Sequence, residues 1–460
     1  MQNFSEYMRA GKHGHLIGVG GVSMSPLAEV LAGMGLLIRG SDINDGDNVA
    51  HLRGKGIEVL IGHRAENLAP DTDFVVRTAA VHDDNPEVAE AHRRGIPVFE
   101  RTQAWGTIMM DYHRSICISG THGKTTTTSM VTHILMAAEM DPTVMIGGTL
   151  PLLHAGHRVG HGDTIVMEAC EYCNSFLNFY PTIAVILDID ADHLDFFKDI
   201  DDIKNSFREF ASHVPPEGDI IANMDDPNVQ EALAPLGRKY MTFGLSEQAD
   251  VCAKNIQSLG PTTDFDIMYR GELFTHVTLQ VPGIHNVKNA PAACAGAIRL
   301  GCGPLAVKYG LGAFHGAGRR FEFKGKYNGA DVFDDYAHHP SELHALLDAT
   351  EHLGYKRRIV VFQPHTYSRT KALFDDFVQE LRRPDLTILA EIYAAREKNT
   401  IGISSRDIAG EIPNSMYFAS FEEIVKALSW TAAPGDLILT VGAGDIYKTG
   451  EQLVKKSEIS

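Results

Sequence analysis

A glycine-rich stretch at residues 119–127 carries the side chains best suited to chemistry. It reads Ser-Gly-Thr-His-Gly-Lys-Thr-Thr-Thr, after an apolar run at 115–118 typical of a buried strand and before a helical pattern at 129–138. In such a loop, backbone N–H groups bind phosphate oxygens, the lysine reaches the outer phosphates, and the next hydroxyl can bind Mg²⁺. The stretch therefore predicts a nucleoside triphosphate site built from Gly120, Thr121, His122, Gly123, Lys124, Thr125 and Thr126.

The loop departs from the strict phosphate-loop pattern at one position. That pattern places a glycine six residues before the lysine, where this chain has Ile118, and Gly120 supplies the glycine instead. A Gly-Lys-Thr turn without function is the alternative. The strand before the loop and the helix after it favour the phosphate site.

Two strand ends offer ligands for the metal ion. One apolar strand ends in Glu168, and a second, at 182–187, runs into an acidic segment at 188–195 that contains His193. Because parallel strands deliver such residues to one edge of a sheet, we expect both side chains near Thr125. Mg²⁺ prefers oxygen ligands, so Glu168 suits direct binding, whereas His193 either binds metal or orients a neighbouring group. These three residues are the predicted metal ligands.

A second glycine turn lies near the start of the chain. It contains Gly18, Gly20 and Gly21, with Ser23 where the dinucleotide-binding pattern has a third glycine, and Asp42 ends the next expected strand. This is a βαβ nucleotide-binding unit in which Asp42 either holds a ribose hydroxyl or is a solvated turn acid. Two nucleotide sites in tandem predict an ATP-using enzyme that acts on a nucleotide-carrying substrate.

The alternation of strands and helices predicts an α/β protein of three domains, at residues 1–112, 113–317 and 318–460. A helix is expected at 86–94, and another opens within 283–290. Strands are expected at 58–61, 74–78, 97–100, 164–168, 182–187, 358–362, 386–391, 416–418 and 437–441, with a meander within 250–282 and a hairpin turned at 328–329.

Composition limits the class of protein. The chain has 460 residues, of which 44% are hydrophobic and 22% charged, as in a soluble globular protein, and its net charge of −18 argues against a general nucleic-acid binder. Six scattered cysteines are no disulfide framework and favour a reducing cytoplasm. No apolar run is long enough to span a bilayer.

Polar residues follow several expected strands of the third domain. Taken singly, each of these residues would be an ordinary solvated loop residue: His338, His365, Arg369, Arg396 and Asp445. Together they predict a face that docks against a partner domain across a cleft.

Two residue pairs in the central domain have more than one reading. Asn286 and Asn289 open an alanine-rich helix, where amide side chains suit an adenine edge but also cap helices. Cys170 and Cys173 have the spacing of a redox or zinc pair, yet no second pair completes a zinc site. We therefore expect these cysteines to be small residues that line the site.

Six motifs in this order resemble the Mur ligases of peptidoglycan synthesis, and the resemblance covers essentially the whole chain. They lie at 120–126, 192–195, 283–290, 319–321, 334–340 and 365–370. The glycine motif at 18–25 and the His-His-Pro run at 338–340 are most similar to the family members that join L-alanine to UDP-N-acetylmuramate.

The resemblance implies a Rossmann-like first domain, a central P-loop ATPase-like domain with extra β strands, and a Rossmann-like third domain. The first would hold UDP-N-acetylmuramate at its glycine turn, the second ATP and Mg²⁺, and the third L-alanine. The expected reaction forms an amide through an acyl phosphate and releases ADP and phosphate. We expect a cytoplasmic enzyme of cell-wall precursor synthesis, a monomer or weak homodimer, that binds small molecules and neither nucleic acid nor membrane.

The resemblance also implies roles for single residues. Lys124 would contact the outer phosphates, Thr125 and Glu168 would hold Mg²⁺, and His193 would bind a second metal ion near the acyl phosphate. Asn286 and Asn289 would lie near adenine, Arg320 would reach phosphate, and Asp335 would approach the ribose of ATP. The residues expected around alanine are Tyr336, His338 and Arg369, and those expected to act in catalysis are Lys124, Glu168, His193, His338 and Arg369.

One segment departs from the family pattern. Many alanine-adding relatives read Glu-Ala-Asp-Glu-Ser-Asp where residues 168–173 read Glu-Ala-Cys-Glu-Tyr-Cys. Two acids become thiols, so contacts of those acids with sugar or metal do not carry over to this chain.

Other functions compete with this reading. A sister ligase that joins a whole peptide to the same nucleotide sugar would need a wider amino-acid pocket. A folylpolyglutamate-type ligase would lack the glycine turn of the first domain. A non-catalytic nucleotide-gated binding protein would lack Glu168 and His193 at neighbouring strand ends.

Overall fold

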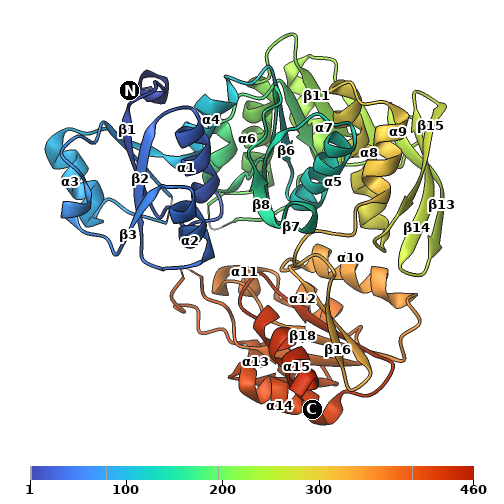
Figure 1. Ribbon diagram of the computed structural model, residues 1–460. Helices are drawn as coiled ribbons and strands as arrows, with labels where there is room; N and C mark the ends of the chain where they lie inside the picture. The colour runs from blue at the N-terminus through green and yellow to red at the C-terminus, as the bar shows by residue number, and fades with distance from the viewer. Residues whose placement is uncertain (1–2, 79, 195, 396, 460) are drawn as a thin grey trace. The chain divides into compact units, whose positions relative to one another are not determined.

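The computed structural model describes residues 3–78, 80–194, 196–395 and 397–459. It contains three β-sheets, one in each of three α/β domains, as the sequence predicts (Figure 1). No helix within these residues is long and apolar enough to cross a bilayer. The chain forms two compact units, the first from residues 1–190, 201–251 and 292–310, the second from residues 191–200, 252–291 and 311–460. The exact domain boundaries stay predictions.

The first domain is a parallel sheet with the strand order β3-β2-β1-β4-β5. Its chain order reverses between β1 and β4, and in doubly wound sheets ligands bind outside the strand ends at such a point. The glycine turn follows β1 directly. The elements are β1 (His13–Ile17), β2 (Leu37–Asp42), β3 (Glu58–Ile61), β4 (Phe74–Arg77), β5 (Val98–Glu100), η1 (Phe4–Tyr7), α1 (Met24–Gly33), α2 (Asp47–Gly54), η2 (Ala65–Asn67), α3 (Pro86–Arg94) and α4 (Arg101–Met109).

The central sheet has seven strands in the first unit, in the order β12-β11-β10-β6-β9-β7-β8. All neighbouring pairs among them are parallel except the β7–β8 hairpin. The elements are β6 (Arg114–Ser119), β7 (Thr143–Leu150), β8 (Ala155–Arg158), β9 (Thr164–Glu168), β10 (Ile183–Ile186), β11 (Asp219–Asn223), β12 (Met241–Gly244), α5 (Lys124–Ala137), α6 (Ile200–Ser212), α7 (Pro227–Leu233), η3 (Pro151–Leu153), η4 (Tyr172–Asn178) and η5 (Ala234–Leu236).

The predicted meander and the helix after it are present. β13 (Val251–Leu259) is followed by β14 (Thr262–Tyr269) and β15 (Glu272–Leu279), and these last two pair antiparallel. Helix α8 (Ile284–Arg299) begins inside the predicted 283–290 segment, and α9 (Pro304–Gly312) follows it.

The third domain has the strand order β16-β17-β21-β18-β19-β20. Its first two strands form the predicted hairpin, turned where Asn328 and Gly329 have φ of 49° and 76°, and the other pairs are parallel. The elements are β16 (Glu322–Tyr327), β17 (Ala330–Asp335), β18 (Arg357–Phe362), β19 (Leu386–Ala390), β20 (Ser415–Phe418), β21 (Asp436–Val441), α10 (Pro340–Glu351), α11 (Tyr367–Ala372), α12 (Phe374–Leu381), α13 (Ser405–Gly410), α14 (Phe421–Thr431) and α15 (Tyr447–Ile459).

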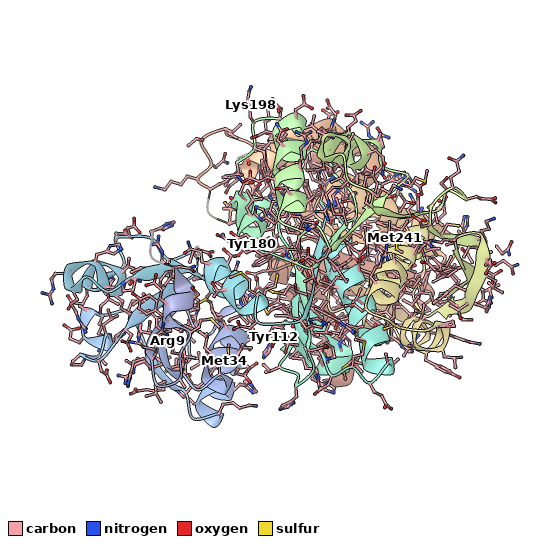
Figure 2. The ribbon with its side chains drawn as sticks, turned by 90° about the horizontal axis from the view of Figure 1, so that it is seen from above. Arg9, Met34, Tyr112, Tyr180, Lys198 and Met241 are labelled. Atoms are coloured by element: carbon pink, nitrogen blue, oxygen red, sulfur yellow. The ribbon has the colours of Figure 1, made fainter. Side chains whose placement is uncertain are left out.

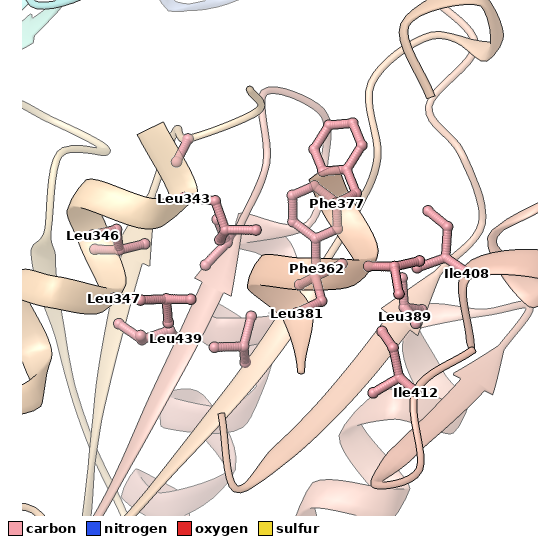
Figure 3. Packing of buried hydrophobic residues seen from close by; sticks show 14 of the residues in the cluster. Leu343, Leu346, Leu347, Phe362, Phe377, Leu381, Leu389, Ile408, Ile412 and Leu439 are labelled. Carbon is pink, nitrogen blue, oxygen red and sulfur yellow. The ribbon is translucent and has the colours of Figure 1, made fainter. Parts of the chain in front are cut away.

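Strand β18 shows why helices cover both faces of this sheet. Val360 and Phe362 join one apolar cluster, which includes Phe377 of α12 (Figure 3). Ile359 and Val361 join a second cluster on the other face. Because successive side chains of a strand point to opposite faces, an unbroken apolar run requires cover on both sides.

The first and central domains meet inside the first unit. Tyr112 lies where the ribbon passes from one to the other (Figure 2), and its hydroxyl donates to Thr143 Oγ1 at 2.9 Å. Burial raises the pKa of this phenol, although its bond to Thr143 opposes the shift. The phenol therefore stays protonated at neutral pH and keeps donating to Thr143.

Helix α5 begins earlier than its apolar pattern suggests, at Lys124 rather than near Ser129. Its first turns are rich in threonine, a weak helix former. The hydroxyls of Thr128 and Ser129 donate to the carbonyls of Lys124 and Thr125 at 2.8 and 2.7 Å, so these buried polar groups are satisfied within the helix.

Gly106 in α4 provides a test of the packing inside the first unit. A Cβ atom at this position would lie 1.8 Å from the carbonyl oxygen of Asn178, which is backbone and cannot swing aside. We expect Gly106→Ala to lower the free energy of unfolding by at least about 3 kcal/mol. Thermal unfolding of the full chain measures this. Gly33→Ala at the end of α1 is the matched control, because nothing lies within 4 Å of its added Cβ. Equal melting temperatures for both variants would contradict the packing.

Candidate active site

The phosphate loop lies at the carboxyl end of β6. This strand pairs with β9, where Ile118 faces Glu168, and with β10, where Ser119 faces Ile186. The loop starts immediately after, at Gly120. The register therefore brings the Glu168 carboxylate to the edge of the sheet from which the loop departs.

The loop is held from the segment after β10. Gly120 and Gly123 adopt φ of 148° and 75°. The backbone N–H of His122 donates to Asp188 Oδ1 at 2.7 Å. Burial raises the pKa of Asp188 to about 6, against the opposing charges of His122 and Lys124. A phosphate bound to this loop would favour the protonated acid further, because it adds negative charge beside it.

Lys124 is fixed at the start of α5. Its ammonium donates to the carbonyls of Gly120 and Thr121 at 2.5 and 3.0 Å and to Glu171 Oε2 at 3.0 Å. Burial acts to lower the pKa of this lysine, but the carboxylates of Glu171 and Glu168 outweigh it, so the net shift is upward. The lysine is therefore charged and preorganised, with Glu171 as its counter-ion.

Thr125 and Glu168 lie together. The threonine hydroxyl donates to Glu168 Oε1 at 3.1 Å, and the N–H of Gly147 in β7 donates to Oε2 at 2.7 Å. A hydroxyl and a carboxylate are the hard oxygen donors that Mg²⁺ prefers, so this pair fits that ion. Gly147 is pressed against the carboxylate, since an added Cβ would lie 2.5 Å from Oε1.

Asp42 is not the solvated turn acid considered as an alternative. It is 9% exposed, and its carboxylate accepts from the N–H of Gly20 at 2.8 Å and of Asn44 at 3.0 Å. Gly18 begins the turn with φ of 77°. Ser23 is the N-cap of α1, and its carbonyl accepts from the indole N–H of Trp105. The carboxylate thus stabilises the glycine turn, and its ribose contact stays a prediction.

In the second unit Arg369 already has a carboxylate partner. Its Nε and Nη2 donate to Asp192 Oδ1 at 3.1 and 2.8 Å, and its Nη1 lies 3.0 Å from His365 Nδ1. Burial acts to raise the pKa of Asp192, but Arg369, His193 and His338 reverse this and hold it below its usual range. A guanidinium has five N–H groups, so further donors remain for a substrate carboxylate.

His193 belongs to this second unit, beside Asp192. It has φ of 55°, its N–H donates to Asp192 Oδ1 at 2.7 Å, and its ring nitrogen Nε2 lies 3.8 Å from Oδ2. Its metal-binding role stays a prediction. Asp195 of the same motif and Arg396 lie outside the described residues.

The two arginines that enter the third domain differ in their surroundings. Arg319 has φ of 58°, and its side chain donates to Asp334 Oδ2 at 2.9 Å and to the carbonyl of Gly442. Arg320 lies over the ring of Tyr336 at 5.1 Å, with Glu342 4.0 Å from its Nη1. Arg319 is therefore structural, whereas Arg320 keeps donors for a ligand.

Asp335 has a structural task as well as its predicted one. Its carboxylate accepts from the N–H of Phe321 at 2.7 Å and of Ala337 at 2.8 Å. Burial raises the pKa of this acid to about 6, although the Arg320 charge opposes the shift. The bonds close the loop beside Tyr336, and the contact with ribose stays a prediction.

Both asparagines lie in the first turns of α8. Asn286 is buried and donates to the carbonyl of Pro282 at 2.7 Å, which caps the segment before the helix. Asn289 is half-buried. In the described part of the chain the buried Nδ1 of His285 has no hydrogen-bond partner, and burial lowers the pKa of this histidine to about 4. Adenine binding near these residues stays a prediction.

Sequence reasoning missed several residues of these sites. Glu171 follows Glu168 by three positions, but it is the N-cap of η4, in which Cys173 and Asn174 have positive φ and no periodicity marks the turn. All six cysteines, Cys170 and Cys173 among them, are free. The remaining missed partners are Asp188, Asp192, Glu342 and Gly147, of which only the first two lie in a segment singled out by its acids.

Family models match nearly the whole chain in three consecutive blocks. Residues 13–113 match the model described as Mur ligase family, catalytic domain. Residues 118–297 match the Mur ligase middle domain, and residues 319–444 match the Mur ligase glutamate ligase domain.

Curated relatives are similar over their full length. The UDP-N-acetylmuramate–L-alanine ligase of Agathobacter rectalis is 48% identical over 449 residues, which cover 96% of this chain and 98% of the relative. That of Clostridium novyi is 47% identical over 447 residues, covering 96% and 97%.

Solved structures agree with the fold. The UDP-N-acetylmuramate–alanine ligase MurC of Thermotoga maritima has a TM-score of 0.81 at 27% identity, covering 97% of this chain and 99% of that one. The murein peptide ligase Mpl of Psychrobacter arcticus has a TM-score of 0.71 at 24% identity, covering 97% and 98%. The second likeness concerns the fold alone.

Because the histidines around Arg369 are buried, we expect the third domain to lose stability as the pH falls. Burial lowers the pKa of His338 to about 4, and the Arg369 charge acts in the same direction. The unfolded chain, with an ordinary histidine pKa near 6.5, therefore binds more protons between about pH 4 and 6.5, and stability falls as the pH falls through this window. We expect His338 alone to cost about 2 kcal/mol between about pH 8 and pH 5.

Thermal unfolding across this pH range checks the prediction. In the unmodified chain His338 Nδ1 lies 3.1 Å from the carbonyl oxygen of Tyr336. The amide of His338→Asn can still donate to this oxygen but does not titrate, so this variant should lose less stability at acid pH. His352→Asn, at the exposed C-cap of α10, should behave as the unmodified chain. Parallel pH profiles for all three proteins would contradict it.

Proposed function

Because the chain belongs to the Mur ligase family, we propose that it is an ATP-dependent ligase that joins the lactyl carboxylate of UDP-N-acetylmuramate to L-alanine. The products are the amide, ADP and phosphate. The reaction belongs to the synthesis of peptidoglycan precursors in the cytoplasm. The observation that carries the proposal is the group formed by Lys124, Thr125 and Glu168 at one sheet edge, in a chain 48% identical to an L-alanine-adding relative.

The chemistry explains why ATP is required. A carboxylate resists attack by an amine, because its carbonyl carbon is electron-rich and oxide is a poor leaving group. Transfer of the γ-phosphoryl group makes an acyl phosphate, whose leaving group is phosphate. The amine of alanine then attacks the carbonyl carbon, and the tetrahedral intermediate expels phosphate.

The residues of the loop and of the neighbouring strand end bind and orient ATP. Lys124 neutralises charge on the outer phosphates, and the N–H groups of the loop direct them. Thr125 and Glu168 would hold Mg²⁺, with His193 as ligand of a second ion. When bound, Mg²⁺ neutralises the charge that develops on the transferred phosphoryl group.

The other substrates are assigned to the first and third domains. The glycine turn at residues 18–23 and Asp42 bind the UDP part of the sugar nucleotide. Arg320 approaches phosphate, Asp335 the ribose, and Asn286 and Asn289 the adenine. Tyr336, His338 and Arg369 surround the alanine, whose carboxylate suits the fork of an arginine.

Similarity to relatives favours alanine over the alternatives. The curated relatives named for L-alanine are 43–48% identical over almost the whole chain. The glycine turn of the first domain disfavours a folate-type ligase. Glu168 beside Thr125 disfavours a binding protein without catalysis.

Phosphate release measures the proposed reaction directly. We expect release that depends on UDP-N-acetylmuramate and ATP together and is fastest with L-alanine in a panel of alanine, glycine, serine and a tripeptide. Mass spectrometry of the product confirms the amide. Faster turnover with the tripeptide would favour the sister ligase, and no release with any acceptor would overturn the proposal.

Lys124→Ala tests the phosphate loop. We expect turnover to fall by at least about 100-fold, because the ammonium stabilises charge that develops on the phosphoryl group. Lys204→Ala is the matched control, since Lys204 of α6 pairs with Asp201 of the same helix and with Glu231 of α7. Near-normal turnover in Lys124→Ala would show that Lys124 does not act in catalysis.

Arg369→Ala tests the amino-acid site. We expect the KM for L-alanine to rise far more than the KM for ATP, because the guanidinium binds the alanine carboxylate. Arg382→Ala, which removes an exposed arginine bonded to the Glu411 carbonyl, should change neither. Equal rises in both constants would mean that Arg369 acts only by fixing Asp192.

A further inference from the structure

We propose that Glu29, His51 and His157 form a transition-metal site for which Zn²⁺ is the best fit. The three residues come from α1, α2 and β8, so the site would tie the helices of the first domain to the β7–β8 hairpin of the central domain. All three lie in the first compact unit. The proposal goes beyond the ligase reaction and uses none of the residues assigned to it.

The ligand atoms already converge. His51 Nε2 and His157 Nε2 lie 2.9 and 3.2 Å from the same oxygen, Glu29 Oε1. One ligand atom from each of the three residues lies within 4.8 Å of the others. Tetrahedral Zn²⁺ with bonds of about 2.0–2.1 Å separates its ligands by about 3.3 Å, so small movements would admit the ion.

The donor set selects the class of metal. Two imidazoles and one carboxylate suit Zn²⁺, Co²⁺ or Ni²⁺, whereas Mg²⁺ requires oxygen ligands. Three protein ligands leave a fourth position for water. The side chains of Glu29 and His157 are 12% and 14% exposed, and that of His51 is 48% exposed, which gives the ion a way in.

The charge at the site is suited to a cation. Hydrogen bonding from His157 outweighs burial and lowers the pKa of Glu29, so this carboxylate is ionised at neutral pH. Lys55 Nζ lies 3.6 Å from the other carboxylate oxygen, Oε2. The oxygen nearest both imidazoles, Oε1, is therefore the one that a metal would use. The loss of its two imidazole contacts would be repaid by metal bonds.

Zinc titration of the full-length chain tests the site. The tag-free protein is treated with a chelator and titrated with ZnCl₂ by calorimetry in excess Mg²⁺, which occupies oxygen-rich sites. We expect one tightly bound equivalent. His51→Asn, His157→Asn and Glu29→Gln should each lose it. His154→Asn should keep it, because this exposed histidine of the same hairpin has φ of 52°, which asparagine tolerates.

A second measurement separates loss of the site from loss of the fold. Co²⁺ added to the metal-free chain should give the intense visible absorption of a tetrahedral complex, and this band should vanish in His51→Asn while its far-ultraviolet circular dichroism is unchanged. Zn²⁺ should also raise the melting temperature of the unmodified chain but not of His51→Asn. One zinc equivalent retained in all three ligand variants, or no tight binding by the unmodified chain, would overturn the proposal.

Discussion

The candidate site depends on the register of one strand. With Ile118 opposite Glu168 and Ser119 opposite Ile186, β6 sets where its neighbours end relative to the loop. Because side chains alternate between faces, a slip of one residue would turn the Glu168 carboxylate away from Thr125. The apolar strands β6, β9 and β10, buried between helices, fix this register through their packing. The position of the Glu168 carboxylate beside Thr125 is thus a consequence of how the buried strands pack.

Carboxylates accompany the cations expected to meet substrate. Glu171 is bonded to Lys124 and Asp192 to Arg369, each with little exposure. Such pairing keeps a buried charge solvated by protein and holds the long side chain in one orientation. An arriving phosphate or carboxylate meets donors already in place. The arriving group must also compete with the carboxylate already bonded to each cation, so molecules with little negative charge bind weakly at these sites.

The sequence predicted the bounds of strands and helices better than it predicted which side chains contact one another. The strand at 164–168 and the helix at 86–94 have the predicted bounds, because periodicity and flanking turns are local signals. Asp192 and Arg369 are 177 positions apart, and no spacing rule links them. Arg319 and Arg320 are adjacent, and both lie over the ring of Tyr336, yet Arg319 donates to Asp334 whereas Arg320 Nη1 lies 4.0 Å from Glu342. Such differences arise from tertiary packing.

The β7–β8 hairpin has a mechanical consequence. At one point the N–H of Gly147 holds the Glu168 carboxylate, and at another His157 lies against Glu29 of the helix that follows the first glycine turn. A displacement of that helix would either break the imidazole–carboxylate contact or move the hairpin as well. In the second case the pull reaches the oxygen atoms beside Thr125. The helix after the first glycine turn and the Glu168 carboxylate are thereby linked through the two strands of this hairpin.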